Sequence, residues 1–571
     1  MKSPTIAANA VAALALLLFG APALHAQTPV QPVIARHGMV VAQEARAARV
    51  GVDILKAGGN AIDAAVATGF ALAVTYPRAG NIGGGGFMLI HLANGKRDVA
   101  IDYRETAPAA TTRDVFLNEQ GEADARKSRE SGLAVGVPGT VAGLTLAHAR
   151  YGSGKLTLAQ LIAPAIRLAR EGIPVEGDIA DTIGGAQPLF ARWPASARIF
   201  LQANGAALAP GETLVQTDLA ASLAAIARDG ARAFYQGSIA EKIVAAVRGA
   251  GGIMTLDDLQ NYRAVERMPL RGRYRGHDIV SMPPPSSGGT ILIEMLNILE
   301  GYPLGKLGAN SDATLHLMIE AMKRAYADRA VYLGDPDFVR MPVKGLTSKR
   351  YAAVLRASID QARATPAADI RAGNVADFEG DNTTHFSVVD RFGNAVANTY
   401  TLNLSYGLGL VAGGTGILLN NELDDFAAKA GAPNAYGLLG GDANAPGPRK
   451  RPLSSMAPTF VFKDGKLLLL TGTPGGSRIP TIVLQVILNV VDHGMSIADA
   501  VAAPRIHHQW LPDEVFVERG LPETAIRALQ ARGHKVTTAP PPGSANSIMV
   551  TQRGFFGAAD ARTRGALAAG Y

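Results

Sequence analysis

Apolar and polar residues follow two different patterns along this chain, and the pattern changes about two-thirds of the way along it. Up to about residue 350 the pattern is mainly helical. Residues 312–333 repeat apolar positions at spacings of three and four, which predicts an amphipathic helix of several turns. A second helix is predicted over 60–74, where Asn60 is the expected N-cap and Asp63 completes a capping box. One hairpin, turning at Asn94–Gly95, interrupts this helical part.

The part from residue 383 onward consists of short alternating segments joined by turn residues. Residues 385–403 predict a strand, a turn at Gly393–Asn394 and a returning strand, and 457–472 predict a hairpin that turns at Asp464–Gly465. A helix is expected at about 479–493, followed by a further hairpin over 546–560. Antiparallel hairpins flanked by buried helices from both parts favour an α+β fold built of stacked layers.

The N-terminus has the composition of an export signal. Lys2 precedes an apolar, Ala-rich run that ends in small residues before Gln27, and this run is too short for a comfortable membrane span. We therefore expect residues 1–26 to be a signal peptide and the mature protein to be periplasmic or secreted, with no membrane anchor after cleavage. The chain has no cysteine, so its fold uses no disulfide bonds.

Charge and composition exclude some partners. The chain has 571 residues, 48% of them hydrophobic, and a formal net charge of +7. Its Lys and Arg residues are scattered rather than clustered, and no basic run reaches five residues. This distribution predicts a mildly basic soluble protein that binds no nucleic acid.

Thr383 stands at the start of the first strand of the second part, immediately after a polar stretch with the composition of an exposed linker, residues 362–382. Inside a chain, a threonine lacks an obvious base. At a chain start, its own α-amine, with a pKa of roughly 8, accepts the hydroxyl proton. On these residues alone, an ordinary strand is the favoured interpretation of the pair Thr383–Thr384, because threonine favours strands.

Several ordered motifs closely resemble the γ-glutamyltranspeptidase family, also called glutathione hydrolases. The resemblance runs from about Arg36 to Tyr571. It implies an N-terminal-nucleophile hydrolase with a four-layer αββα sandwich, whose precursor is cut between Asn382 and Thr383. The products would be a large subunit, 27–382, and a small subunit, 383–571, which pair as a heterodimer and share one core. The motifs are NIGGGGFM (81–88), IDYRETAP (101–108), TLNLSYGLGLVAGGTGILLNNELDDF (401–426), KRPLSSMAPT (450–459) and TGTPGGSRI (471–479).

The resemblance assigns catalytic roles to a few of these residues. Thr383 would be the nucleophile. Thr401 lies on the returning strand of the first hairpin, where a turn near residue 393 places position 401 close to opposite 383, so the Thr401 hydroxyl is expected to orient Thr383. The resemblance gives Asn403, two residues on, a role in substrate binding. Gly475 and Gly476 would offer backbone N–H groups to a negatively charged oxygen of the intermediate.

A γ-glutamyl substrate ends in a zwitterion, so its site needs a cation for the α-carboxylate and anions for the α-amine. Arg104 suits the first role, because a guanidinium binds a carboxylate through two hydrogen bonds. The resemblance gives the second role to Glu422 and Asp425. It adds hydroxyl hydrogen bonds from Ser454 and Ser455.

The Gly- and Pro-rich segment 430–450 has the length and composition of a functional lid, and Tyr436 within it matches the aromatic residue at the gate in family members that possess the lid. The four glycines at 83–86 lack the Lys-Ser/Thr of a phosphate-binding loop and are interpreted as close backbone packing. We expect no catalytic metal and no organic cofactor, because the histidines show no metal-ligand spacing.

The expected substrates are glutathione and other γ-glutamyl compounds, and the expected acceptors are water, amino acids and short peptides. Two alternatives remain open. A cephalosporin (glutaryl) acylase-like amidase of the same fold would accept a side chain without the α-amine. A binding protein that keeps the fold would never be cut.

Overall fold

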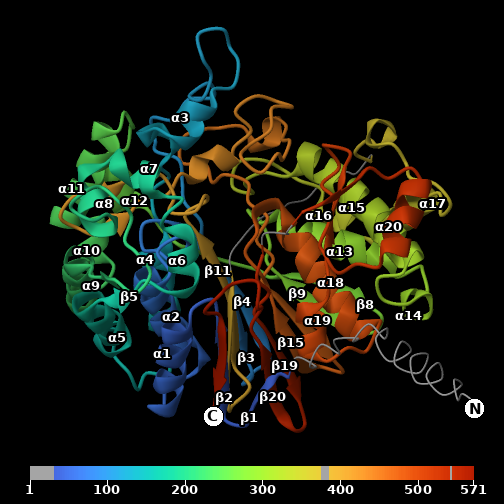
Figure 1. The fold of residues 1–571 in the computed structure, drawn as a ribbon, viewed down its shortest axis with the longest axis horizontal. Coiled ribbons are helices and arrows are strands. Elements are labelled where there is room, and N and C mark those ends of the chain that lie inside the picture. Colours follow the sequence, from blue (N-terminus) through green and yellow to red (C-terminus); the bar gives the residue numbers. More distant parts are fainter. Residues whose placement is uncertain (1–30, 374–384, 540–542) are drawn as a thin grey trace, which may run out of the picture. The chain divides into compact units, whose positions relative to one another are not determined.

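The computed structural model describes residues 31–373, 385–539 and 543–571, so the expected signal peptide and the Asn382–Thr383 bond lie outside the described residues. Residues Pro32–Tyr571 form one compact unit. Two seven-stranded sheets stack at its centre, and helices cover the outer face of each sheet (Figure 1). This arrangement confirms the predicted α+β fold with four αββα layers.

Both sheets combine strands from the two sides of position 383. In the second sheet, β10 and β11 lie between β2 and β3, which precede them by hundreds of residues. The first sheet has the order β1 (Val33–Ala35), β20 (Gly554–Ala558), β19 (Ser547–Thr551), β15 (Lys466–Thr471), β14 (Thr459–Lys463), β9 (His277–Ser281) and β8 (Leu270–Tyr274). The second has the order β21 (Leu567–Gly570), β2 (Gly38–Ala42), β10 (Phe386–Asp390), β11 (Ala395–Thr401), β3 (Gly85–Leu92), β4 (Arg97–Tyr103) and β7 (Val265–Arg267).

Alternating side chains explain the layering. Successive residues of a strand point to opposite faces of its sheet. In β2, Met39 and Val41 belong to the apolar core between the two sheets, whereas Val40 between them packs in the core under the helices. Both faces of the central strands are therefore buried, and every residue of β2, β10 and β11 is buried.

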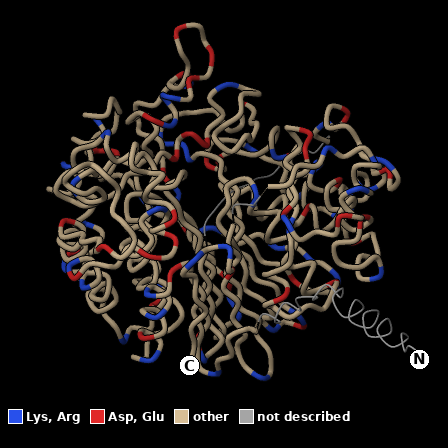
Figure 2. Tube along the Cα trace, viewed as in Figure 1, with Lys and Arg blue, Asp and Glu red and all other residues tan. Residues whose placement is uncertain are grey.

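One helical layer covers each sheet. The layer over the second sheet contains α1 (Ala45–Lys56), α2 (Ala61–Thr75), α4 (Thr140–Tyr151), α5 (Leu158–Glu171), α9 (Thr217–Asp229) and α11 (Ser238–Gly249). The layer over the first contains α13 (Ser287–Leu299), α15 (Asp312–Tyr332), α17 (Lys349–Ala357), α18 (Ile479–Val491), α19 (Ile497–Ala502) and α20 (Glu523–Ala531). Charged residues gather on the helices and outer loops, and the central strands carry few of them (Figure 2).

Shorter elements complete the fold. The short helices are α3 (Ala125–Arg129), α6 (Gly177–Thr182), α7 (Gln187–Ala191), α8 (Pro194–Phe200), α10 (Arg232–Tyr235), α12 (Leu256–Asn261), α14 (Leu304–Leu307) and α16 (Val343–Leu346). Three small sheets pair β5 (Ile173–Pro174) with β6 (Thr213–Leu214), β12 (Val411–Ala412) with β13 (Ile417–Leu418), and β16 (Ile506–His507) with β17 (Val515–Val517) and β18 (Val536–Thr538). Among the described residues, no helix combines the length and apolar content needed to cross a membrane.

Local predictions from the sequence are largely confirmed. The Asn60–Asp63 capping box opens α2, and β3–β4, β10–β11, β14–β15 and β19–β20 form the predicted hairpins. The glycines at 83–86 do pack against backbone: a Cβ added to Gly84 would lie 2.0 Å from the carbonyl oxygen of Thr401.

The predicted amphipathicity of α15 is wrong, although the helix itself is present. Every residue from Thr314 to Ala330 is buried, including charged ones. Glu320 accepts a hydrogen bond of 2.7 Å from Arg324 and lies 3.3 Å from Lys323, so the charges neutralise one another inside the protein. The polar stripe of the sequence is a buried ion-pair network rather than a solvated face.

Candidate active site

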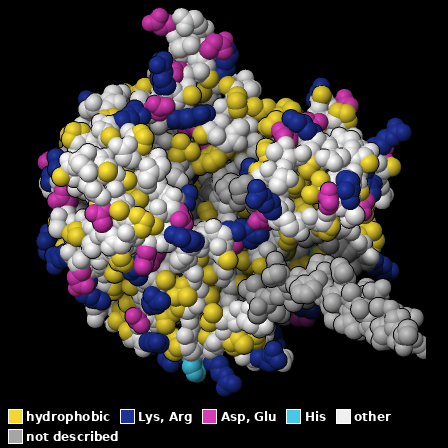
Figure 3. All heavy atoms as spheres, in the orientation of Figure 1, with side chains coloured by type: hydrophobic (Ala, Val, Ile, Leu, Met, Phe, Trp, Pro, Cys, Tyr) yellow, Lys and Arg dark blue, Asp and Glu magenta, His cyan; other side chains and the backbone are white. Residues whose placement is uncertain are grey.

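A cavity of about 350 Å³ opens beyond the end of β11. Its walls come from segments that are far apart in the sequence. Most of the predicted site residues line it: Thr401, Asn403, Glu422, Asp425, Tyr436, Ser455, Gly475 and Gly476. One face of the molecule is hollowed between the two helical layers, and Lys and Arg side chains gather at the margin of the hollow (Figure 3). Thr383 and Asn382 lie outside the described residues, so their predicted roles stay predictions.

Thr401 is the last residue of β11, and its hydroxyl fixes the turn that follows. Its Oγ1 accepts a hydrogen bond of 2.9 Å from the backbone N–H of Asn403. Asn403 has a φ of 73°, a left-handed conformation that asparagine tolerates better than most residues. The Asn403 amide also donates to the carbonyl oxygen of Asn421, 3.0 Å away. Both residues border the cavity in a conformation set by local hydrogen bonds.

Arg104 follows β4 and is fully buried. Its Nη1 donates to Glu422, and its Nη2 lies 2.7 Å from Asp425 Oδ2. The cation expected to bind a substrate carboxylate is therefore paired with the two acids expected to bind the amine. Glu422 and Asp425 occupy a short 3₁₀ turn, Glu422–Asp425, and line the cavity.

Burial governs the protonation of this cluster. Removal from water raises the pKa of Glu422 to about 8 and that of Asp425 to about 6, although Arg104 opposes both shifts. The same burial would lower the pKa of Arg104, but Glu422 and Asp425 outweigh it and raise that pKa above its usual value. Arg104 stays charged, and the two acids titrate near neutral pH.

Glu105 is a site residue that the sequence reasoning did not single out. It is fully buried beside Arg104, with 3.9 Å between its Oε2 and Arg104 Nη1. Neither of its carboxyl oxygens has a hydrogen-bond partner among the described residues. Burial, with repulsion from Glu422, raises the pKa of Glu105 well above its usual value. Its presence in the motif IDYRETAP was visible, but nothing local to that motif indicates three carboxyl groups around one guanidinium.

Gly475 and Gly476 lie where a strand-to-helix turn leads into α18. Their φ angles are 136° and 55°, which favour glycine. A Cβ added to Gly476 would lie 2.4 Å from Cδ1 of Tyr436, so the lid packs directly on this glycine. Among the described residues, neither glycine N–H donates a hydrogen bond. Two adjacent N–H groups bordering a cavity can stabilise a developing negative charge.

The two serines occupy different positions. Ser455 lines the cavity, and its buried hydroxyl has no hydrogen-bond partner among the described residues. Ser454 is fully buried, and its carbonyl oxygen accepts a hydrogen bond of 3.1 Å from the hydroxyl of Ser287. A buried hydroxyl without a hydrogen-bond partner destabilises the protein, and a ligand that supplies the partner removes this cost. Ser455 therefore has the properties of a binding residue.

The segment predicted to be a lid, 430–450, contributes Tyr436 and Leu438 to the cavity wall. Tyr436 donates a hydrogen bond of 2.7 Å from its hydroxyl to the carbonyl oxygen of Asn403. Gln509 holds the same residue from the other side, since its Nε2 lies 3.1 Å from the carbonyl oxygen of Tyr436. At the end of the segment, the N–H of Ala107 donates a hydrogen bond of 2.8 Å to the carbonyl oxygen of Lys450, and the N–H of Arg449 donates one of 3.1 Å to the carbonyl oxygen of Ala107. The lid is therefore anchored at both its middle and its end.

The cavity wall also carries charged residues that no sequence motif predicted. Arg78 pairs with Asp178 at 2.7 Å, and Arg562 pairs with Glu518 and Asp560. Arg78, Asp178 and Arg562 all line the cavity. They come from three separate regions of the chain, and none stands in a motif with a recognisable spacing.

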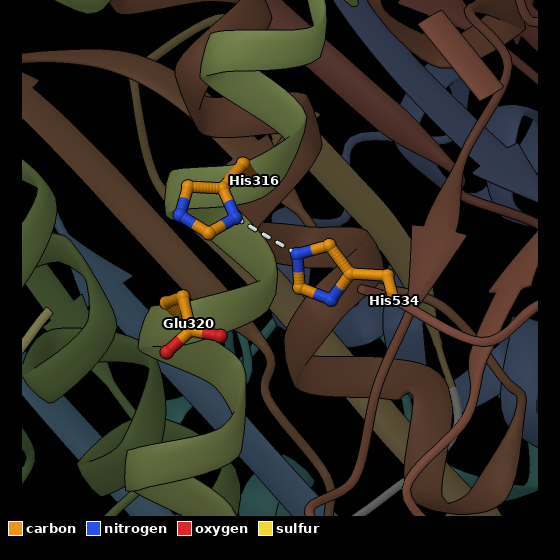
Figure 4. A group of neighbouring side chains, drawn as sticks. All are labelled: His316, Glu320 and His534. Carbon is orange, nitrogen blue, oxygen red and sulfur yellow. Dashed lines mark hydrogen bonds between the residues drawn. The ribbon is translucent and has the colours of Figure 1, made fainter. Parts of the chain in front are cut away.

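One group of side chains in the described residues has the composition of a metal site. Ligand atoms of His316, Glu320 and His534 lie within 4.8 Å of one another (Figure 4). The two histidines are hydrogen-bonded at 2.8 Å, and burial lowers the pKa of His534 to about 3. Glu320 is already paired with Lys323 and Arg324. A metal ion would lie beside these two buried cations, so the cluster is better suited to joining α15 to the chain after α20.

Comparison with known proteins identifies the family. The γ-glutamyltranspeptidase family model matches residues 47–570. A glutathione hydrolase proenzyme of Escherichia coli (strain K12) is 53% identical over 95% of this chain and 93% of its own length. An acylase ACY 1 proenzyme of Pseudomonas sp. (strain V22) is 41% identical over 89% of each chain. The crystal structure of a cephalosporin acylase from Bacillus halodurans superimposes with a TM-score of 0.84 at 29% identity, covering 97% of this chain and 99% of that one. The chain belongs to the γ-glutamyltranspeptidase family.

Proposed function

We propose that this chain is exported as a precursor, loses residues 1–26, and cuts itself between Asn382 and Thr383. The products are a large chain, 27–382, and a small chain, 383–571, that remain together. The mature protein transfers the γ-glutamyl group of glutathione or a related γ-glutamyl compound to water, or to an amino acid or short peptide.

The Thr383 hydroxyl acts twice, first in self-cleavage and then in the attack on the substrate. Its Oγ1 attacks the carbonyl carbon of Asn382, the peptide C–N bond breaks, and the acyl group is carried as an ester on Thr383. Breaking the C–N bond frees the Thr383 α-amine, and water then hydrolyses the ester, which ends the covalent link between the two chains and restores the Thr383 hydroxyl. The hydroxyl then attacks the γ-amide carbon of the substrate while the amine takes up its proton and passes it to the leaving amine.

The cavity supplies the remaining parts of this chemistry. Gly475 and Gly476 line it, and their N–H groups would stabilise the oxyanion; losing one such donor typically costs about 3 kcal/mol. In the β10–β11 hairpin, Phe386 pairs with Asn398. The expected role of Thr401 beside Thr383 depends on this register, because the same offset would pair position 383 with position 401. The γ-glutamyl ester finally reacts with water or with the acceptor amine.

Recognition of the glutamyl group is the step that the described residues support most directly. A buried guanidinium lies within hydrogen-bond distance of Glu422 and Asp425, and the acids face the cavity. The substrate ammonium would take over part of the role of Arg104 as the counterion of the two acids. Its carboxylate would then bind the freed guanidinium edge and the Ser455 hydroxyl. The Ser454 hydroxyl would add a further hydrogen bond to the substrate carboxylate.

This arrangement favours a γ-glutamyl donor over the glutaryl group of an acylase substrate. A glutaryl group has no α-amine, so it would bring one more negative charge to a site that already holds buried acids, and it would leave them without a new partner. The two acids at the cavity wall are the observation that carries the proposal.

Hydrolysis of two chromogenic amides by the purified protein tests it. We expect γ-glutamyl-p-nitroanilide to be cleaved at least tenfold more efficiently, in kcat/KM, than glutaryl-p-nitroanilide. Added glycylglycine should accelerate p-nitroaniline release if the acyl group passes to a peptide. Equal or better cleavage of the glutaryl amide would instead favour the acylase alternative.

A further inference from the structure

Asn434, in the lid, connects the lid to the acid pair. Its Nδ2 donates a hydrogen bond of 2.9 Å to Asp425 Oδ1. The other oxygen of Asp425, Oδ2, lies 2.7 Å from Arg104 Nη2. Asp425 is thus held at one oxygen by the buried cation and at the other by the lid.

The orientation of the Asn434 amide is fixed by its other contacts. Its Oδ1 accepts hydrogen bonds from the backbone N–H groups of Tyr436, at 3.0 Å, and Leu438, at 3.1 Å. An oxygen is the only atom of the amide that can accept them, so the NH₂ group must face Asp425. The neighbouring N–H of Ala435 adds a bond of 2.8 Å to Asp424 Oδ2.

One side chain therefore makes two connections of different kinds. Its oxygen shapes the turn that presents Tyr436 above Gly476. Its nitrogen fixes the plane of the carboxylate of Asp425, a residue that lines the cavity and is 7% exposed. A carboxylate bound at both oxygens loses little further freedom when an ammonium group binds it, and such preorganisation improves affinity.

We propose that Asn434 is a positioning residue for recognition of the donor α-amino group: it orients Asp425 and couples that carboxylate to closure of the lid. The inference rests on the proposed function of Asp425 as an ammonium-binding residue. It predicts that loss of Asn434 reduces the discrimination between ligands that have an α-amine and ligands that lack it.

Calorimetric titration of the mature protein with L-glutamate and with glutarate measures that discrimination. In Asn434→Ala we expect the ratio of the two affinities to fall about tenfold, because one hydrogen bond to a charged group is lost. Asn434→Ser should show the same fall. A serine hydroxyl can still accept from the N–H two residues on, but it is too short to replace the NH₂ donor.

Gln509→Ala is the matched control, because it removes a lid contact at the carbonyl oxygen of Tyr436 and leaves Asp425 untouched. It should weaken both ligands by the same factor. An unchanged ratio in both Asn434 variants, or an equal fall of the ratio in Gln509→Ala, would overturn the inference. Failure of the proposed function would be distinct: the unsubstituted protein would then bind glutarate as tightly as glutamate and leave γ-glutamyl-p-nitroanilide intact.

Discussion

Replacement of Arg104 by glutamine tests the charge balance of the buried cluster. Glutamine keeps most of the side-chain length and some hydrogen bonding, but it removes the positive charge. Glu422 and Asp425, both within hydrogen-bond distance of the guanidinium, would then lie in the interior without a counterion. Removing one partner of a buried ion pair typically costs about 3–5 kcal/mol.

The destabilisation should depend on pH in a definite direction. The pKa values of Glu422 and Asp425 are already raised, to about 8 and about 6, and loss of Arg104 raises them further. An acid whose pKa is higher in the folded state stabilises the protein below its unfolded pKa, and that contribution is lost as the pH rises through the folded pKa. As the pH rises from about 5 to about 9, the free energy of unfolding should therefore decrease more in Arg104→Gln than in the unsubstituted protein.

Thermal unfolding of both proteins at pH 5 and pH 8.5 measures the effect. For a chain of this size, with an unfolding entropy of roughly 2 cal/mol/K per residue, a loss of 3–5 kcal/mol lowers the Tm by about 3–4 °C. We expect this difference at pH 8.5 and less than half of it at pH 5, where the acids take up protons. An equal decrease at both pH values would show that Arg104 stabilises the site by packing, and the charge argument would be refuted.

Two further predictions concern the cavity itself. Gly476→Ala places a methyl group 2.4 Å from Tyr436 at a φ of 55°, so kcat/KM for γ-glutamyl-p-nitroanilide should fall about a hundredfold. Adding Tyr436→Ala to this variant removes the aromatic ring and should restore part of the activity. Full activity of Gly476→Ala alone would contradict the packing described. Because Glu422 must lose its proton to bind an ammonium group, KM for the same donor should decrease as the pH rises from 6.5 to 8.5. Glu422→Gln should make KM nearly independent of pH over this range. If KM of the variant still depends on pH as in the unsubstituted protein, the titrating group is not Glu422.

The fold could be predicted from the sequence wherever the signals are local. The Asn60–Asp63 capping box and the turn at Asp464–Gly465 each involve residues a few positions apart, and both are present in the structure. The burial of α15 could not be predicted in this way. Its charged side chains are neutralised by each other and by distant segments, so the polar pattern resembled that of a solvated helix face.

The candidate site likewise combines residues that the sequence indicated with residues whose role only the folded structure reveals. The resemblance supplied Arg104, Glu422 and Asp425, but only the folded chain brings them together, across more than 300 residues of sequence. Glu105 and Asn434 were missed because their significance lies in one contact each with this cluster. A lone asparagine in a Gly- and Pro-rich loop is usually a turn residue. Asn434 is such a residue, and it also bonds a buried acid.

The most direct test of the central claim is the intact mass of the purified protein beside that of Thr383→Ala. We expect two chains for the unsubstituted protein, the smaller beginning at Thr383, and one uncut, inactive chain for the variant. Efficient cutting of the variant, or an active unsubstituted protein whose chain still spans Asn382 and Thr383, would contradict it.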